Sequence, residues 1–214
     1  YLAEVSAYEH DYPYSVMMPQ IHYQCGLNLF DDNNFEAASK KFGSFTSNEL
    51  FKTQVPEFLF KKAYCDFGTG DYANALVGFS KVESLPHSDY TAPARYSIGY
   101  IYYSKKDFDE AYDWFSKSVK DSRFTDVSNY YMLECRFMNK DYNYVVDNGT
   151  KLYNQVPEDR KPHLARIISE SYLVLGDANS AKDYYEKNVN NKEIMNRSDY
   201  FYAGSVLYAV QDYK

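Results

Sequence analysis

One pattern of residues returns five times along this chain at an almost constant interval. Each copy holds a polar pair, a marker residue that is usually aromatic, a small residue three positions later and a large residue four positions after that. The clearest copies are Asn33-Asn34-Phe35 with Ala38 and Phe42, Gly70-Asp71-Tyr72 with Ala75 and Phe79, and Lys106-Asp107-Phe108 with Ala111 and Phe115. The marker positions are 35, 72, 108, 142 and 178, which gives steps of 37, 36, 34 and 36 residues. A unit this short cannot bury its own apolar face, so neighbouring units must complete each other's core.

Each unit is predicted to form two helices. The first opens near a proline in four of the units, since a residue in the first helical turn needs no bonded N–H. A small residue inside the first helix lets the second helix approach closely; these residues are Gly26, Ala63, Gly99, Ser169 and Gly204. The predicted pairs are 18–31 with 34–46, 56–68 with 71–83, 92–104 with 107–119, 126–138 with 141–153, and 162–175 with 178–189, followed by one helix at 198–211.

The repeated series of a small residue, Tyr, Gly-Asp-Tyr, Ala and Phe resembles the tetratricopeptide repeat family. Residues Arg95 to Val119 are the closest copy, and the resemblance extends over residues 18–214. It implies an all-α fold, a right-handed superhelical solenoid of antiparallel helix pairs with about five repeats and one additional helix. The first helices would line a concave groove, and residues 1–17 would form an N-terminal extension. The family implies binding and scaffolding, without catalytic chemistry.

The fourth unit departs from the pattern. It carries Leu133 in place of the small first-helix residue, Val145 in place of Ala, and Gly149 in place of the large residue. Asn148-Gly149 is a turn signal in other contexts. We therefore expect a strained or shortened second helix in this unit.

Charge and hydropathy exclude two classes of partner. The formal net charge is −7, whereas a protein that binds a nucleic-acid backbone needs an excess of Lys and Arg. The apolar runs fall far short of the roughly 20 residues needed to cross a bilayer, so no membrane span is expected. The chain starts with Tyr1 and ends where another second helix would begin, so we expect it to be a piece of a longer protein. A cytoplasmic and a periplasmic or other extracytoplasmic location both remain open.

The three cysteines, Cys25, Cys65 and Cys135, fall in first helices of different units. Cys65 and Cys135 occupy the same repeat position two units apart, which places them beyond the reach of a disulfide. We expect three buried free thiols that act as small apolar residues.

Aromatic residues occupy the positions that line the concave groove in the family. By that resemblance we predict a partner-binding surface made of Tyr64, Phe67, Tyr96, Tyr100, Tyr103 and Tyr130. Tyrosine offers a rigid apolar body and a hydroxyl that needs a partner, which suits a recognition surface. The competing interpretation is that these rings serve packing alone. Family members that clamp a partner's terminal carboxylate use Lys, Asn and Arg, and the matching positions here include Tyr23, Leu27 and Tyr64, so that mode of binding is not expected.

Catalysis and cofactors are not expected. The four histidines are scattered over different units, with no Cys or Ser motif beside them and no metal-ligand spacing. Gly68-Thr69-Gly70 does not follow a strand, so it is interpreted as a repeat turn and not as a phosphate loop.

The resulting hypothesis is a non-enzymatic scaffold that binds a protein or an extended peptide in its groove. Two alternatives remain: a carbohydrate-binding component of a cell envelope, suggested by the tyrosines, and a non-catalytic portion of a larger enzyme or signalling protein.

Overall fold

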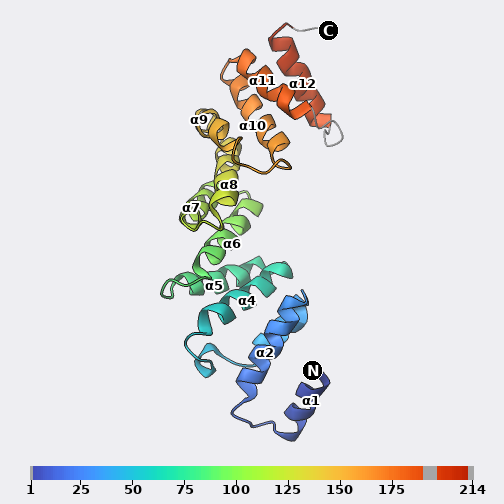
Figure 1. Ribbon diagram of the computed structural model, residues 1–214, viewed down its shortest axis with the longest axis vertical. Helices are drawn as coiled ribbons and strands as arrows, with labels where there is room; N and C mark the ends of the chain where they lie inside the picture. The colour runs from blue at the N-terminus through green and yellow to red at the C-terminus, as the bar shows by residue number, and fades with distance from the viewer. Residues whose placement is uncertain (1, 190–196, 212–214) are drawn as a thin grey trace. The chain divides into compact units, whose positions relative to one another are not determined.

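The computed structural model describes residues 2–189 and 197–211, and these residues form helices without a strand (Figure 1). The chain divides into two compact units, Tyr1–Ile101 and Tyr102–Lys214. The helices of the first unit are α1 (Leu2–Asp11), α2 (Met18–Asp31), α3 (Phe35–Phe42), the short 3₁₀ helix η1 (Ser47–Glu49), α4 (Val55–Gly68) and α5 (Tyr72–Glu83). Helix α6 (Thr91–Ser104) contains the boundary, and the second unit continues with α7 (Phe108–Ser118), α8 (Thr125–Met138), α9 (Tyr142–Leu152), α10 (Lys161–Val174), α11 (Ala178–Val189) and α12 (Arg197–Ala209).

Within each unit the helices pack in the predicted pairs. In unit 1, α2 packs on α3 and α4 packs on α5, and α3 also contacts α4. In unit 2, α8 packs on α9 and α10 packs on α11, and α10 contacts both α9 and α12. Figure 1 shows α4 beside α5 and α10 beside α11. The prediction of an all-α fold built from helix pairs is confirmed.

The turn between the two helices of a repeat contains a left-handed residue in each of the five repeats. A residue with positive φ precedes each second helix: Asn33 (59°), Gly70 (83°), Lys106 (64°), Lys140 (62°) and Gly176 (87°). Gln211 adopts φ 59° at the equivalent position after α12. The next polar residue is the N-cap of the second helix, and in four of the five repeats its side chain accepts a capping hydrogen bond, as where Asp71 accepts from the Asn74 amide at 3.1 Å. The polar pair found in the sequence is therefore a left-handed turn residue followed by an N-cap.

Small residues lie where the paired helices approach most closely. A Cβ atom added to Gly26 would lie 2.4 Å from the Phe42 ring, and one added to Gly78 would lie 2.5 Å from Cβ of Ala63. In the fifth repeat the Ser169 hydroxyl donates to the Ala181 carbonyl oxygen at 2.5 Å. Three of the five predicted small positions thus lie against the second helix of their own repeat.

Two predicted helices differ from the structure. The helix expected at 34–46 ends at Phe42, because the chain turns at Gly43 so that Phe45 can be buried against Phe58, with the two ring centroids 5.0 Å apart. The strained or shortened helix expected around Gly149 is wrong, since α9 has 11 residues, the same length as α7. A Cβ on Gly149 would lie 2.8 Å from Ile168, so the glycine brings α9 and α10 together.

The predicted N-terminal extension contains a helix of its own. Helix α1 buries Val5 and contacts α2. Its Glu9 carboxylate forms an ion pair with Lys41 and lies 2.6 Å from Nε2 of His22. These polar contacts attach the extension to the first repeat.

The core of each unit is apolar and the cysteines belong to it. Cys25, Cys65 and Cys135 are free and fully buried, which confirms the prediction. Burial raises the pKa of both the Cys65 and the Cys135 thiols to about 12. Among the described residues, no helix is long and apolar enough to cross a bilayer.

Candidate partner-binding surface

In unit 1, aromatic rings form a connected strip along the first helices. We call Phe30, Phe60, Tyr64, Phe67 and Tyr100 the aromatic strip. Tyr64 lies at its centre, with its ring centroid 5.5 Å from that of Phe30, 6.0 Å from Phe60 and 5.7 Å from Phe67. The Phe67 ring then lies 5.9 Å from Tyr100 in an edge-on arrangement. All five side chains are half-buried, so each ring supports its neighbours and still contributes surface.

The Tyr64 hydroxyl makes no hydrogen bond with any residue that the structure describes; the ring contacts account for its interactions. A phenolic hydroxyl usually finds a partner when it is buried. The Tyr64 hydroxyl is therefore a donor and acceptor left to water or to a ligand.

The predicted site residues of unit 2 have a different environment. The Tyr103 hydroxyl donates to Oε2 of Glu134 at 2.7 Å, and the Tyr130 hydroxyl lies 2.8 Å from Nδ1 of His163. Glu134 is buried and also pairs with His163 at 3.1 Å. Burial and the Glu134 carboxylate hold the pKa values of the Tyr103 and Tyr130 hydroxyls well above their usual range.

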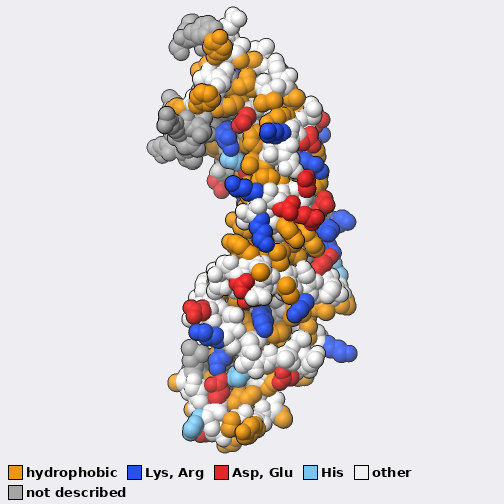
Figure 2. Space-filling view, turned by 180° about the vertical axis from the view of Figure 1, so that it is seen from behind, with side chains coloured by type: hydrophobic (Ala, Val, Ile, Leu, Met, Phe, Trp, Pro, Cys, Tyr) orange, Lys and Arg blue, Asp and Glu red, His pale blue; other side chains and the backbone are white. Residues whose placement is uncertain are grey.

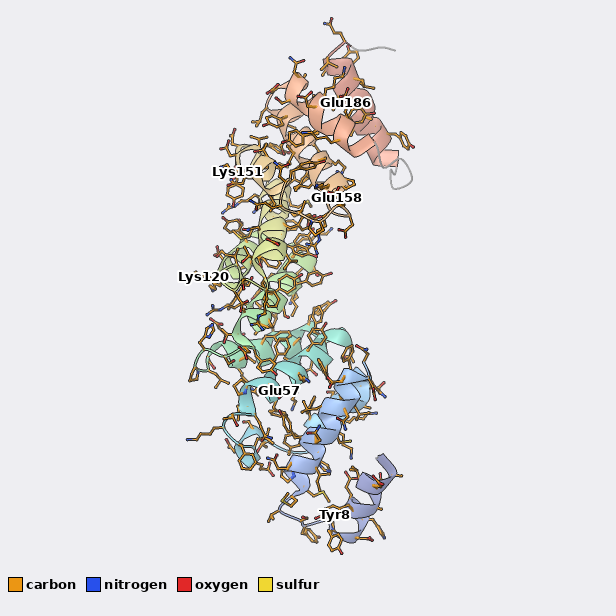
Figure 3. All side chains as sticks on the ribbon, viewed as in Figure 1. Tyr8, Glu57, Lys120, Lys151, Glu158 and Glu186 are labelled. Atoms are coloured by element: carbon orange, nitrogen blue, oxygen red, sulfur yellow. The ribbon has the colours of Figure 1, made fainter. Side chains whose placement is uncertain are left out.

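The same kind of contact joins the first repeats. The Tyr23 hydroxyl of α2 donates to Oε2 of Glu57 on α4 at 2.8 Å, and Figure 3 labels Glu57 at its place on α4. At the other end of the chain, the Tyr202 hydroxyl of α12 donates to the Ser169 hydroxyl of α10 at 2.9 Å. First-helix tyrosines thus connect successive first helices through their hydroxyl groups. Tyr23, Tyr103 and Tyr202 therefore have a structural role, because their hydroxyl groups join one repeat to the next.

The six predicted site residues therefore fall into two groups. In unit 1 the structure brings together Tyr64, Phe67 and Tyr100, while Tyr96 is half-buried on the same helix as Tyr100. In unit 2, Tyr103 and Tyr130 both contact Tyr131, with ring centroids 5.1 and 5.5 Å apart.

Sequence reasoning missed the acidic residues that organise these tyrosines. Glu57 and Glu134 each follow their tyrosine partner by one repeat, 34 and 31 residues along the chain. A search for acidic residues at one repeat's distance from a first-helix tyrosine would have found both.

One histidine outside this surface has a serine and a carboxylate beside it. The Ser44 hydroxyl lies 2.6 Å from Nδ1 of His22, whose Nε2 faces Glu9. No sequence motif indicates this arrangement, because Ser44 is 22 residues from His22. The Ser44 hydroxyl also donates to the Lys41 carbonyl oxygen at 2.7 Å. The Ser44 proton then points to a backbone carbonyl and not to the His22 imidazole, so His22 does not activate Ser44 as a nucleophile. The contacts among Ser44, His22 and Glu9 instead attach α1 to the first repeat.

Charged side chains of both signs are interspersed on the face shown in Figure 2. Over residues 2–189 and 197–211, no cluster of three or more His, Cys, Asp or Glu side chains is placed to hold a metal ion.

Paired helices with a recurrent left-handed turn and a small residue at the helix crossing define a helical repeat protein. In the sequence comparison, the family model for the tetratricopeptide repeat matches residues 92–120. This segment contains the stretch that carries the closest sequence resemblance. The chain carries a tetratricopeptide repeat there, and the suspected relationship is confirmed. A comparison with curated proteins found no match to the sequence.

Solved structures with the same fold include MamA and PilW. MamA of strain AMB-1 is 10% identical with a TM-score of 0.71, over 86% of this chain and 97% of that one. MamA from Desulfovibrio magneticus RS-1 is 15% identical with a TM-score of 0.66, over 82% of this chain and 96% of that one. PilW, described as a widely conserved type IV pilus biogenesis factor, is 13% identical with a TM-score of 0.62, over 91% of this chain and 87% of that one. At these identities the likeness concerns the fold.

Proposed function

We propose that this chain is a protein-interaction scaffold and that the aromatic strip of unit 1 binds an extended peptide segment of a protein partner. The observation that carries the proposal is Tyr64. Its half-buried ring is held by the rings around it, and its hydroxyl has no partner among the described residues. By contrast, the hydroxyls of Tyr103 and Tyr130 are occupied within unit 2.

The chemistry of the aromatic strip suits an extended ligand. Rings that are already packed lose little conformational entropy on binding, and they offer flat apolar area to proline or other apolar side chains. The open Tyr64 hydroxyl can bond to a backbone carbonyl or amide of the peptide. Tyr103 and Tyr130 contribute their ring faces at most. The comparisons give no support to carbohydrate binding or to a place within a larger enzyme.

The test is a selection of twelve-residue peptides from a random displayed library, followed by calorimetric titration of the enriched peptides. Replacing a hot-spot ring typically costs about 2 kcal/mol of binding free energy. Tyr64→Ala and Phe67→Ala should therefore weaken binding about thirtyfold, with helicity unchanged by circular dichroism. Tyr14→Ala is the matched control, since Tyr14 is 97% exposed and lies outside the strip.

Enriched peptides that bind Tyr64→Ala and Phe67→Ala as tightly as the parent would contradict the proposal. The same conclusion would follow if Tyr14→Ala weakened binding as much as Tyr64→Ala.

A further inference from the structure

A second surface of unit 1 lies between α4 and α5, on a different side of α4 from the aromatic strip. Here the two helices and the segment 45–47 enclose an open hollow of about 430 Å³. Its apolar lining includes Phe45, Phe58, Ala63 and Gly78. Residues 62, 63 and 66 of α4 line the hollow, whereas 60, 64 and 67 carry the strip. At about 100° per residue, the two sets centre on different parts of the helix circumference. We call this hollow the α4–α5 groove.

The hollow between paired helices differs in size between the second and fourth repeats. The fourth repeat has a hollow at the same place between α8 and α9, lined by Leu133 and Asn148, with a volume of about 240 Å³. Leu133 and Asn148 occupy the repeat positions of Ala63 and Gly78. The larger hollow of the second repeat accompanies smaller residues at both of these positions, and residues 45–47 add to its lining.

The rim of the groove carries two lysines. Lys62 and Lys81 make no ion pair with the described residues, and Lys81 is exposed. The one carboxylate in the lining of the groove is that of Asp66. Burial and the nearby Asp71 charge raise its pKa, and the Lys62 charge acts against that rise. Two lysines and one carboxylate leave the rim with an excess positive charge, in a chain with a net charge of −7. This positive charge complements an anionic ligand.

Apolar surface continues from the groove onto α5, where Val77 is 56% exposed. A ligand longer than one side chain would cover it. We propose that the α4–α5 groove is a second docking site, which takes a large apolar side chain of a partner polypeptide flanked by carboxylates that contact Lys62 and Lys81. This site does not depend on the aromatic strip.

The test uses two fluorescein-labelled peptides of equal length with one central phenylalanine, flanked by glutamates in one and by lysines in the other. Binding to the full chain is followed by fluorescence anisotropy, and amide chemical shifts locate the contact. The glutamate peptide should bind and should shift the Val77 and Gly78 amides. The lysine peptide should bind at least about tenfold more weakly, because like charges at the rim repel.

The variant Lys62→Glu/Lys81→Glu should weaken binding of the glutamate peptide about tenfold and restore binding of the lysine peptide. Lys151→Glu is the matched control, because Lys151 has the equivalent place at the narrower groove of the fourth repeat; Figure 3 labels it on α9. Equal binding of the two peptides, an unaffected double variant, or shifts that map to Tyr64 and Phe67 would each overturn the proposal.

Discussion

Glu134 offers the sharpest test of the structural role of the tyrosines. The side chain of Glu134 is 8% exposed, accepts a hydrogen bond from the Tyr103 hydroxyl at 2.7 Å and pairs with His163 at 3.1 Å. Replacing it with alanine leaves the Tyr103 hydroxyl without its acceptor and opens a cavity. Each hydrogen bond to a charged group contributes about 1.5–3 kcal/mol. His163 is 43% exposed, so water can replace most of its contact. We therefore expect Glu134→Ala to lower the free energy of unfolding by about 3 kcal/mol.

The assay is urea unfolding followed by circular dichroism. Glu134→Gln keeps the volume and an acceptor oxygen, so it should cost about 1 kcal/mol. Glu110→Ala on the exposed face of α7 is the control and should change stability by no more than about 0.5 kcal/mol. A double-mutant cycle of Tyr103→Phe with Glu134→Ala should give a coupling energy of about 1–2 kcal/mol. Additive effects, or a loss from Glu134→Ala no larger than that from Glu110→Ala, would show that Glu134 does not stabilise the fold through Tyr103.

Four further predictions concern particular sites. Gly149→Val should lower the free energy of unfolding by about 1–3 kcal/mol, because the added side chain overpacks against Ile168. Gly204→Ala is the control: no atom lies within 4 Å of the added Cβ, so its thermal unfolding midpoint should be unchanged or higher. Lys140→Gly should raise stability by up to about 1 kcal/mol, because φ at this turn is 62°; an unchanged or lower unfolding midpoint would argue against strain there. With a pKa of about 12, the Cys65 and Cys135 thiols should react slowly with a thiol reagent at pH 8 in the native protein and quickly in denaturant; fast native labelling would contradict their burial. Lys41 and His22 lower the pKa of Glu9, so the stability that Glu9 gives to the attachment of α1 is present above the pKa of an unfolded glutamate and is lost as the pH falls through the folded pKa. The amide protection factors of α1 should therefore fall in acid in the parent and stay constant in Glu9→Gln; the same fall in both proteins would contradict this role.

The repeat architecture could be predicted because each repeat encodes it locally. The polar pair before each marker residue corresponds to a left-handed turn residue and an N-cap, and the small residues mark helix crossings such as Gly26 against Phe42. The end of α3 could not be predicted in the same way, because it depends on burial of Phe45 against Phe58 in the next helix. Gly149 was misinterpreted for a similar reason: its close neighbour Ile168 belongs to α10, 19 residues further on.

The candidate site was predictable only in part. The sequence places tyrosines on the first helices, but it does not show which hydroxyls find partners. That distinction depends on Glu134 for Tyr103 and on His163 for Tyr130, both about one repeat away. A single sequence read one helix at a time cannot separate a tyrosine that joins two repeats from one that faces a ligand.

The most direct test of the central claim is to locate a bound peptide on unit 1. Tyr64 is replaced by the photo-crosslinking residue p-benzoylphenylalanine, and in separate proteins Val77 and Tyr14 are replaced in the same way. Each protein is irradiated with a peptide from the displayed-library selection, and the adducts are mapped by mass spectrometry. We expect a crosslink from position 64 that excess unlabelled peptide abolishes, and none from position 14; position 77 reports on the α4–α5 groove. Crosslinks from position 77 or 14 without one from position 64 would show that the aromatic strip is not the binding surface.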